Sequence, residues 1–267
     1  MDEKPIHIGG GAEKILTFVD DGAKKPPSTV QTTLNSHYTV VFCISAHGDA
    51  TKPALLFPLK NDPEEAEPYL GRIQCYSTGS GYMQAEFMRR WALDVFLPKV
   101  TELRTLHHQS DAPVLLILDN HASRRDSQLL TSLADNNITV FTLPSNSTFV
   151  LQPLDLVFNG AFQNHFRSKF LSCFHGSGVA VERFALLSAV WDAFLVSCQS
   201  KTITAGFKQA GIYPLDQIQP LTSNGVISGD EPQLKTLPGG APDTRGRVIT
   251  QSDFIKEVFQ WENKKNK

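Results

Sequence analysis

Two aspartates, Asp119 and Asp155, follow segments that would place their carboxylates at the same edge of a sheet. Asp119 comes directly after Val114–Leu118, an unbroken run of apolar residues. Such a short run, rich in branched aliphatics, predicts a strand buried on both faces. A carboxylate at the C-terminal end of that strand would lie at the rim of the sheet, where open α/β folds place their sites. The interval to Asp155 has room for a helix, a second strand and a loop that return the chain to this rim.

Carboxylates from separate segments are the ligands that hard divalent cations prefer, and two such ions can cleave a phosphodiester by in-line attack. Each aspartate also has a purely structural interpretation. An aspartate after a strand is often a turn former, and Asp155 alone is equally well explained as a helix N-cap. The residues around them decide between these interpretations.

The flanking phrases resemble a known family. They are Leu115-Leu116-Ile117-Leu118-Asp119-Asn120-His121 and, ending at Asp155, Leu143-Pro144-Ser145-Asn146-Ser147-Thr148-Phe149-Val150-Leu151-Gln152-Pro153-Leu154. Both resemble the DDE superfamily endonuclease domain in the pogo/Tigger/jerky branch of transposases, to which centromere protein B is related. The start of the chain, Met1–Ile6, matches the tail of the family's first acidic phrase. The resemblance runs from Asp2 to about Leu215.

The resemblance implies an α/β fold with a ribonuclease-H-like mixed sheet flanked by helices. It also implies that Asp2, Asp119 and Asp155 are catalytic residues that hold two Mg²⁺ or Mn²⁺ ions. Asp2 rests on a four-residue match at the start of the chain. The reaction implied is phosphodiester cleavage and strand transfer without a covalent enzyme intermediate.

Five further residues are candidates for the site. Arg124 and Arg125 are expected to contact DNA phosphates, and an exposed basic face is the alternative interpretation. We expect the remaining three to line the site without ligating a metal, although His121 could instead bond within its own turn. They are Asn120, His121 and Gln152.

The expected partner is DNA, either transposon ends or derived sites, with no membrane, in the nucleus, and a homodimer is compatible with this assignment. The net charge of −2 gives no nucleic-acid signature of its own. The leading hypothesis is therefore a transposase nuclease domain. A relic or domesticated protein that keeps the fold without cutting is the alternative hypothesis. A different ribonuclease-H-like nuclease is disfavoured by the Leu151–Asp155 phrase.

The elements that must position these residues follow from periodicity and turn residues. Residues 37–45 and 54–59 predict an antiparallel hairpin. Residues 82–100 predict a helix, with Pro98 ending it or beginning an extension. A phenylalanine every fourth residue, from Phe158 to Phe170, predicts a packed helix face. Further helices are expected at 123–134, 182–199 and 202–211, and a strand at 138–143.

Two predictions concern the ends of the chain. We expect one domain over residues 1–215 and a largely disordered tail over 216–267, with a short helix near Ser252–Trp261. Residues 9–36 predict a loop. No strand precedes Asp2, and the family's helix-turn-helix is missing, which predicts a truncated product with at most weak, non-specific nicking. The four cysteines are expected to be reduced thiols.

Overall fold

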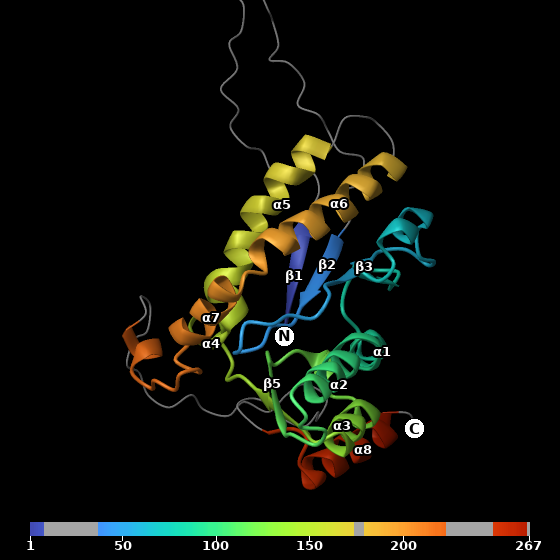
Figure 1. The fold of residues 1–267 in the computed structure, drawn as a ribbon. Coiled ribbons are helices and arrows are strands. Elements are labelled where there is room, and N and C mark those ends of the chain that lie inside the picture. Colours follow the sequence, from blue (N-terminus) through green and yellow to red (C-terminus); the bar gives the residue numbers. More distant parts are fainter. Residues whose placement is uncertain (8–36, 174–178, 223–247, 266–267) are drawn as a thin grey trace, which may run out of the picture.

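The computed structural model describes residues 1–7, 37–173, 179–222 and 248–265 (Figure 1). The predicted loop at 9–36 lies outside these residues. Within them the strands form a four-stranded sheet in the order β1-β2-β3-β4 and a two-stranded sheet, β5-β6. The strands are β1 (Asp2–His7), β2 (His37–Phe42), β3 (Ala54–Phe57), β4 (Gln74–Ser77), β5 (Val114–Leu118) and β6 (Ile138–Thr142).

The larger sheet is mixed. β2 pairs antiparallel with β3, which confirms the predicted hairpin, and β3 pairs parallel with β4. β1 was not predicted as a strand. It pairs antiparallel with β2, so that Asp2 lies opposite Phe42. This strand begins with three charged residues, Asp2-Glu3-Lys4, followed by Pro5. Its pairing with the apolar β2 stabilises an extended conformation that its own composition indicates only weakly.

The strand predicted at Val114–Leu118 is confirmed as β5, which pairs parallel with β6. Its predicted burial on both faces is wrong. Leu116 and Leu118 are buried, but Leu115 is 59% exposed. The second face of β5 borders a cavity of about 520 Å³. The amino group of Met1 donates to the carbonyl oxygen of Ile117 at 3.0 Å, which links the two sheets.

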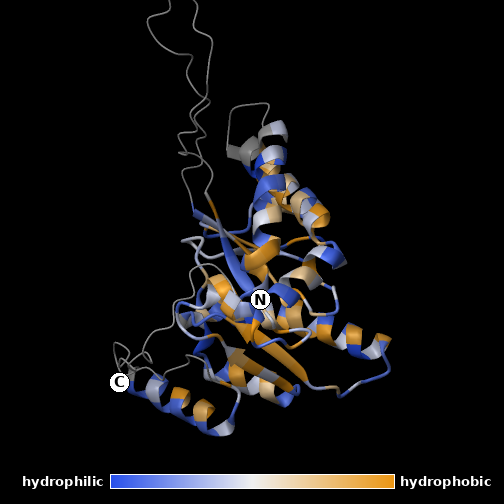
Figure 2. Cartoon of the chain, turned by 90° about the vertical axis from the view of Figure 1, so that its left-hand side faces the viewer, coloured by the Kyte–Doolittle hydropathy of each residue, from blue (hydrophilic) through white to orange (hydrophobic). Residues whose placement is uncertain are grey.

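Helices cover both faces of the larger sheet (Figures 1 and 2). In Figure 2 the hydrophobic colour gathers on the strands and on the helix faces turned toward them. The mixed α/β architecture agrees with the expected ribonuclease-H-like class. The helices and helical turns are η1 (Glu64–Tyr69), α1 (Ala85–Trp91), η2 (Ala92–Phe96), α2 (Leu97–Leu106), η3 (Ala122–Arg124), α3 (Ser127–Asp135), α4 (Thr148–Leu151), η4 (Leu154–Phe158), α5 (Asn159–Cys173), α6 (Val179–Ser197), α7 (Ser200–Gln209), η5 (Gln219–Thr222) and α8 (Ser252–Lys265).

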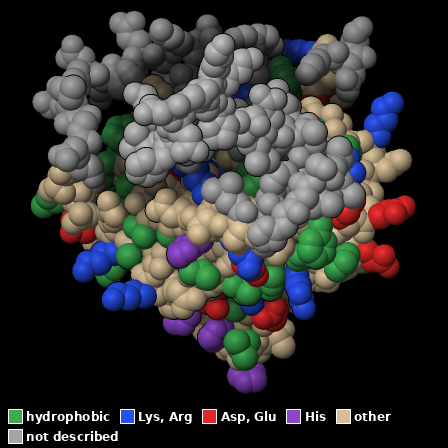
Figure 3. Space-filling model, turned by 90° about the horizontal axis from the view of Figure 1, so that it is seen from above, with side chains coloured by type: hydrophobic (Ala, Val, Ile, Leu, Met, Phe, Trp, Pro, Cys, Tyr) green, Lys and Arg blue, Asp and Glu red, His purple; other side chains and the backbone are tan. Residues whose placement is uncertain are grey.

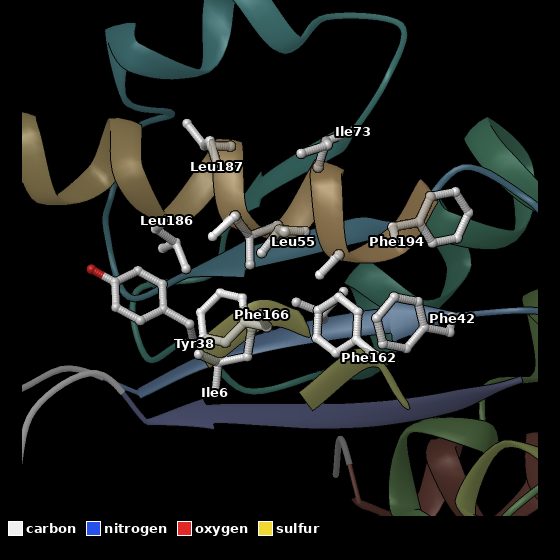
Figure 4. Packing of buried hydrophobic residues seen from close by; sticks show 14 of the residues in the cluster. Ile6, Tyr38, Phe42, Leu55, Ile73, Phe162, Phe166, Leu186, Leu187 and Phe194 are labelled. Carbon is white, nitrogen blue, oxygen red and sulfur yellow. The ribbon is translucent and has the colours of Figure 1, made fainter. Parts of the chain in front are cut away.

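The cluster on the α5 and α6 side is aromatic (Figure 4). Phe162, Phe166 and Phe170 stack successively along α5, with ring centroids 5.7–5.8 Å apart. Phe42 of β2 meets Phe162 edge-on at 4.7 Å. The phenylalanine stripe predicted to be packing therefore forms the contact between α5 and the sheet.

The helix predicted over residues 82–100 is real but changes geometry along its length. α1 passes into η2, a π-helical turn, and then into α2, which ends at Leu106. Pro98 stands in the first turn of α2 and begins an extension rather than ending the helix. Proline is tolerated there because the wider turn before it removes the clash with the preceding carbonyl.

The predicted helix in the tail is also present, as α8. Ser127 of α3 donates its hydroxyl to Glu262 at 2.6 Å, and Phe254 and Val258 are buried in the core cluster that contains β5 and β6. The division into a domain and a tail stays a prediction, and residues 223–247 lie outside the described chain. No helix among the described residues is long and apolar enough to cross a membrane.

Candidate functional site

The three aspartates come from three separate elements. Asp2 begins β1, Asp119 follows β5, and Asp155 lies in η4, a π-helical turn that leads into α5. Two contacts fix η4 against the rest of the molecule. The amide of Gln152, 1% exposed, donates to the carbonyl of Met1 at 3.2 Å. Gly206 lets α7 approach closely, since a Cβ there would lie 2.5 Å from the carbonyl oxygen of Pro153.

Asp2 and Asp155 share a neutral hydrogen-bond donor. The Nδ2 atom of Asn159 donates to Oδ2 of Asp2 at 3.0 Å and to Oδ1 of Asp155 at 2.9 Å. Asn159 is 3% exposed. Sequence analysis missed this residue, although one signal was available. Asn159 lies four positions after Asp155, and such residues are neighbours on a helical face.

Asp119 has a different partner. Arg124 places one guanidinium nitrogen 2.7 Å from Oδ1 of Asp119 and another 2.7 Å from Oε1 of Glu3. Its side chain has no exposed surface. Burial opposes the charged form, but Glu3 and Asp119 outweigh this effect and raise the pKa of Arg124 above its ordinary value. The guanidinium therefore stays charged and links β1 to the end of β5.

This placement corrects one prediction. Arg124 was expected to contact a DNA phosphate, but a fully buried guanidinium held by two carboxylates has no surface to offer a phosphate in this conformation. Arg125 is only partly buried. Its phosphate contact stays a prediction.

Asp2 and Asp155 both lie within hydrogen-bond distance of the Asn159 amide nitrogen, and the electrostatics of Asp2 agree with this proximity. The pKa of Asp2 is raised to about 6 by burial first, then by the charges of Asp155 and, less strongly, of Asp119. The amino terminus and a hydrogen bond from the backbone of Glu3 act in the opposite direction. Negative charge is therefore concentrated where β1, β5 and η4 meet.

The donor set fits a hard divalent cation in its chemistry, because it consists of carboxylate oxygens and one amide. The carbonyl oxygen of Asn159 is also buried without a hydrogen-bond partner among the described residues. The spacing of these side chains does not by itself form a metal site. Within the described ranges no group of three or more His, Cys, Asp or Glu side chains is close enough together to hold a metal ion.

Three other predicted residues surround the acids. His121 is exposed, and its Nδ1 lies 2.8 Å from the hydroxyl of Ser123, which matches the alternative of bonding within its own turn. Asn120, half-buried, follows Asp119 directly. Gln152 is buried, and its amide donates to the carbonyl oxygen of Met1, the residue before Asp2. Their roles as residues that line the site stay predictions.

Comparison with known proteins identifies the family. A sequence model described as DDE superfamily endonuclease matches residues 35–207. The chain belongs to this family. Asp119 and Asp155 lie within the matched residues, whereas Asp2 lies before them.

A curated relative is similar over part of the chain. Over 152 residues the chain is 31% identical to a protein called "MFS-type transporter clz9" from Cochliobolus lunatus. The alignment covers 55% of this chain and 15% of that protein. No solved structure matches the chain significantly.

Proposed function

We propose that this DDE endonuclease domain cuts and joins DNA strands as part of a transposase of the pogo/Tigger/jerky branch. Asp2, Asp119 and Asp155 are its catalytic and metal-binding residues. The observation that carries the proposal is that one buried amide, Asn159, donates to both Asp2 and Asp155, which come from distant segments of the chain. The raised pKa of Asp2 agrees with this arrangement. Like charges are rarely gathered in a buried place without a function, and perturbed pKa values concentrate at functional sites.

The proposed cofactor is a pair of Mg²⁺ or Mn²⁺ ions held by the three aspartates. Bound ions of this kind would activate the attacking hydroxyl and stabilise the leaving oxygen. The residues of the chain supply position. Arg124 fixes the direction of the Asp119 carboxylate, and Asn159 fixes those of Asp2 and Asp155. Asp2 must lose its proton to ligate a cation, and a cation favours that loss.

The proposed partner is DNA, in the nucleus, with a homodimer as the assembly. Acidic and basic side chains are interspersed on the described part of the face seen in Figure 3. Attraction of the DNA backbone to such a face is weak, because the affinity for DNA depends on clustered basic residues. Arg125, which follows the buried Arg124 in the segment after Asp119, is the proposed phosphate contact.

A second function is favoured by two observations. Oδ1 of Asp119 is already engaged by the buried Arg124, and no metal-ready group of three acids is present among the described residues. A relic or domesticated domain that binds nucleic acid or another protein without cutting would retain the fold and this internal ion pair.

A nicking assay separates the two functions. Purified chain is incubated with supercoiled plasmid and Mn²⁺, and the relaxed form is measured over time. We expect slow nicking without end specificity, and Asp119→Asn is expected to lower the rate by at least about 10²-fold because misplaced catalytic groups cost that much. Asp111→Asn, a change at an exposed aspartate, serves as the matched control.

The outcomes are distinct. Equal nicking by wild type and Asp119→Asn would assign the activity to another site or to a contaminant. Binding of the plasmid without any nicking, in a folded wild-type protein supplied with Mn²⁺, would support the non-cutting alternative.

A further inference from the structure

Asn159 is the one uncharged side chain shown to contact two of the three aspartates, within the described part of the chain. We propose that Asn159 is a positioning residue that sets the spacing between Asp2 and Asp155 for a divalent cation. This inference rests on the proposed function and deepens it, because it names a residue that shapes the metal site without ligating the metal.

The chemistry of the amide suits this role. Two carboxylates at short range repel each other, and a single amide nitrogen carries two N–H donors, one for each carboxylate. A lysine or arginine in the same place would also hold both acids, but its charge would repel the incoming cation. A neutral donor orients the carboxylates and leaves their charge for the metal.

The orientation of the amide follows from its surroundings. If the amide were turned around, its carbonyl oxygen would face the oxygens of Asp2 and Asp155, which is repulsive. In the orientation observed, that carbonyl oxygen is buried and has no partner among the described residues. An unpaired buried oxygen costs free energy. The two hydrogen bonds to Asp2 and Asp155 therefore determine the orientation of the amide, although its carbonyl oxygen is left unpaired.

The backbone around Asn159 holds it firmly. It is the first residue of α5 and follows the π-helical turn η4, which contains Asp155. Its neighbours Phe158 and Phe162 are fully buried and meet Phe42 of β2 edge-on, at 5.0 and 4.7 Å. Since β2 pairs with β1, the same packing fixes Asn159 relative to Asp2.

The test compares Asn159→Leu with Asn164→Leu. Leucine has the same number and branching of side-chain heavy atoms as asparagine and replaces the polar atoms by methyl groups. Asn164 is an exposed residue of the same helix. Mn²⁺ binding to the full chain is measured by calorimetry, and folding by thermal unfolding without metal. Loss of a group that orients metal ligands typically weakens metal binding about 10- to 100-fold. We expect a rise of that size in the Kd of Mn²⁺ for Asn159→Leu and no change for Asn164→Leu.

A role in folding alone would have a different signature. It would lower the Tm of Asn159→Leu and leave the Kd of the folded protein unchanged, and this result would overturn the inference. Asn159→Ser is the second variant if leucine prevents folding. Its hydroxyl has one donor and can serve only one carboxylate, so the same rise in Kd is expected.

Failure of the inference and failure of the proposed function can be told apart. If Asp119→Asn abolishes Mn²⁺ binding while both Asn159 variants bind as tightly as wild type, the metal site stands and the role of Asn159 is wrong. If the folded wild-type chain does not bind Mn²⁺, the proposed function and this inference are both wrong.

Discussion

The two sides of the acidic cluster are held by different chemistry. On one side Arg124, with no exposed surface, pairs with Asp119 and Glu3 at 2.7 Å each. On the other side Asn159, a neutral amide, donates to Asp2 and Asp155. Asp119 therefore faces a cationic side chain, whereas Asp2 and Asp155 share a neutral donor and the amino terminus is the positive group that acts on Asp2. One side of the cluster is thus held by an ion pair and the other by hydrogen bonds from a neutral amide.

The pKa values agree with this difference. The pKa of Asp2 is raised to about 6, with burial and Asp155 as the two largest causes. Asp119, whose charge faces Arg124, has a smaller influence on Asp2 than Asp155 has. A buried ion pair contributes little net stability, but it orients its members and is costly to break. The carboxylate of Asp119 is thus held by a charged partner, and those of Asp2 and Asp155 are held by a neutral one.

The largest expected effect comes from removing the guanidinium of Arg124, which pairs with Glu3 and Asp119. Arg124→Met keeps much of the side-chain volume and leaves Glu3 and Asp119 without their cation. Removal of one partner of a buried pair typically costs about 3–5 kcal/mol, and we expect a loss of this size in the free energy of unfolding, measured by urea titration.

Arg72→Met, at an exposed arginine, is the control and should change stability by less than about 0.5 kcal/mol. The double variant Arg124→Met with Glu3→Gln should regain part of the loss, because one unpaired charge is removed. A loss below about 1 kcal/mol in the free energy of unfolding of Arg124→Met would contradict a strong pairing of Arg124 with Glu3 and Asp119.

Much of the fold could be predicted from local patterns. The hairpin of β2 and β3, the position of the strand β5 and the phenylalanine face of α5 all have strong local sequence patterns and were predicted correctly. β1 was missed because its pairing with β2, and not its own sequence, makes it a strand. The exposure of Leu115 was missed for a similar reason. An apolar run indicates burial on both faces only when both faces are covered, which depends on tertiary structure.

The site was harder to predict than the fold. The aspartates could be named from the phrases around them, because those phrases resemble a family. Arg124 was taken for a surface residue, since arginine is almost never fully buried unless it is paired. Its pairing with Glu3 depends on β1 lying beside the end of β5, and sequence patterns do not contain that contact. Asn159 was missed because its partner Asp2 is 157 positions away in the sequence, and no local pattern shows that the two are in contact.

A smaller effect is expected from the titration of Asp2, which makes the stability of the protein depend on pH. The folded pKa of Asp2, about 6, lies above its ordinary value of 3.8. Below pH 4 Asp2 is protonated in both states and contributes nothing. Between pH 4 and 6 the unfolded chain releases the proton and the folded chain keeps it, so stability falls as pH rises, by up to roughly 3 kcal/mol.

Asp2→Asn removes this titration and keeps an acceptor for Asn159. The stability of the variant relative to wild type should therefore increase from pH 4 to pH 6 and stay constant above about pH 7, as measured by chemical unfolding at each pH. A stability difference between Asp2→Asn and wild type that does not change with pH would show that the pKa of Asp2 is not raised in the folded protein. The electrostatic difference between the Arg124 side and the Asn159 side would then lack support.

The smallest expected effect is a difference between two single substitutions. Asp155→Asn and Asp119→Asn each remove one negative charge near Asp2, and the pKa of Asp2 can be followed by NMR titration of its carboxyl carbon. Both should lower that pKa from about 6, because both charges raise it.

Asp155→Asn should lower the pKa of Asp2 more than Asp119→Asn does. Asp155 shares the donor of Asn159 with Asp2, whereas the charge of Asp119 is compensated by Arg124. Neither should restore the ordinary value of 3.8, because burial is the largest cause and remains. In the background of Arg124→Met the charge of Asp119 is no longer compensated, so its removal should then matter more. Equal shifts from the two substitutions in the wild-type background would mean that Arg124 does not shield Asp119, and the two sides of the cluster would be electrically alike.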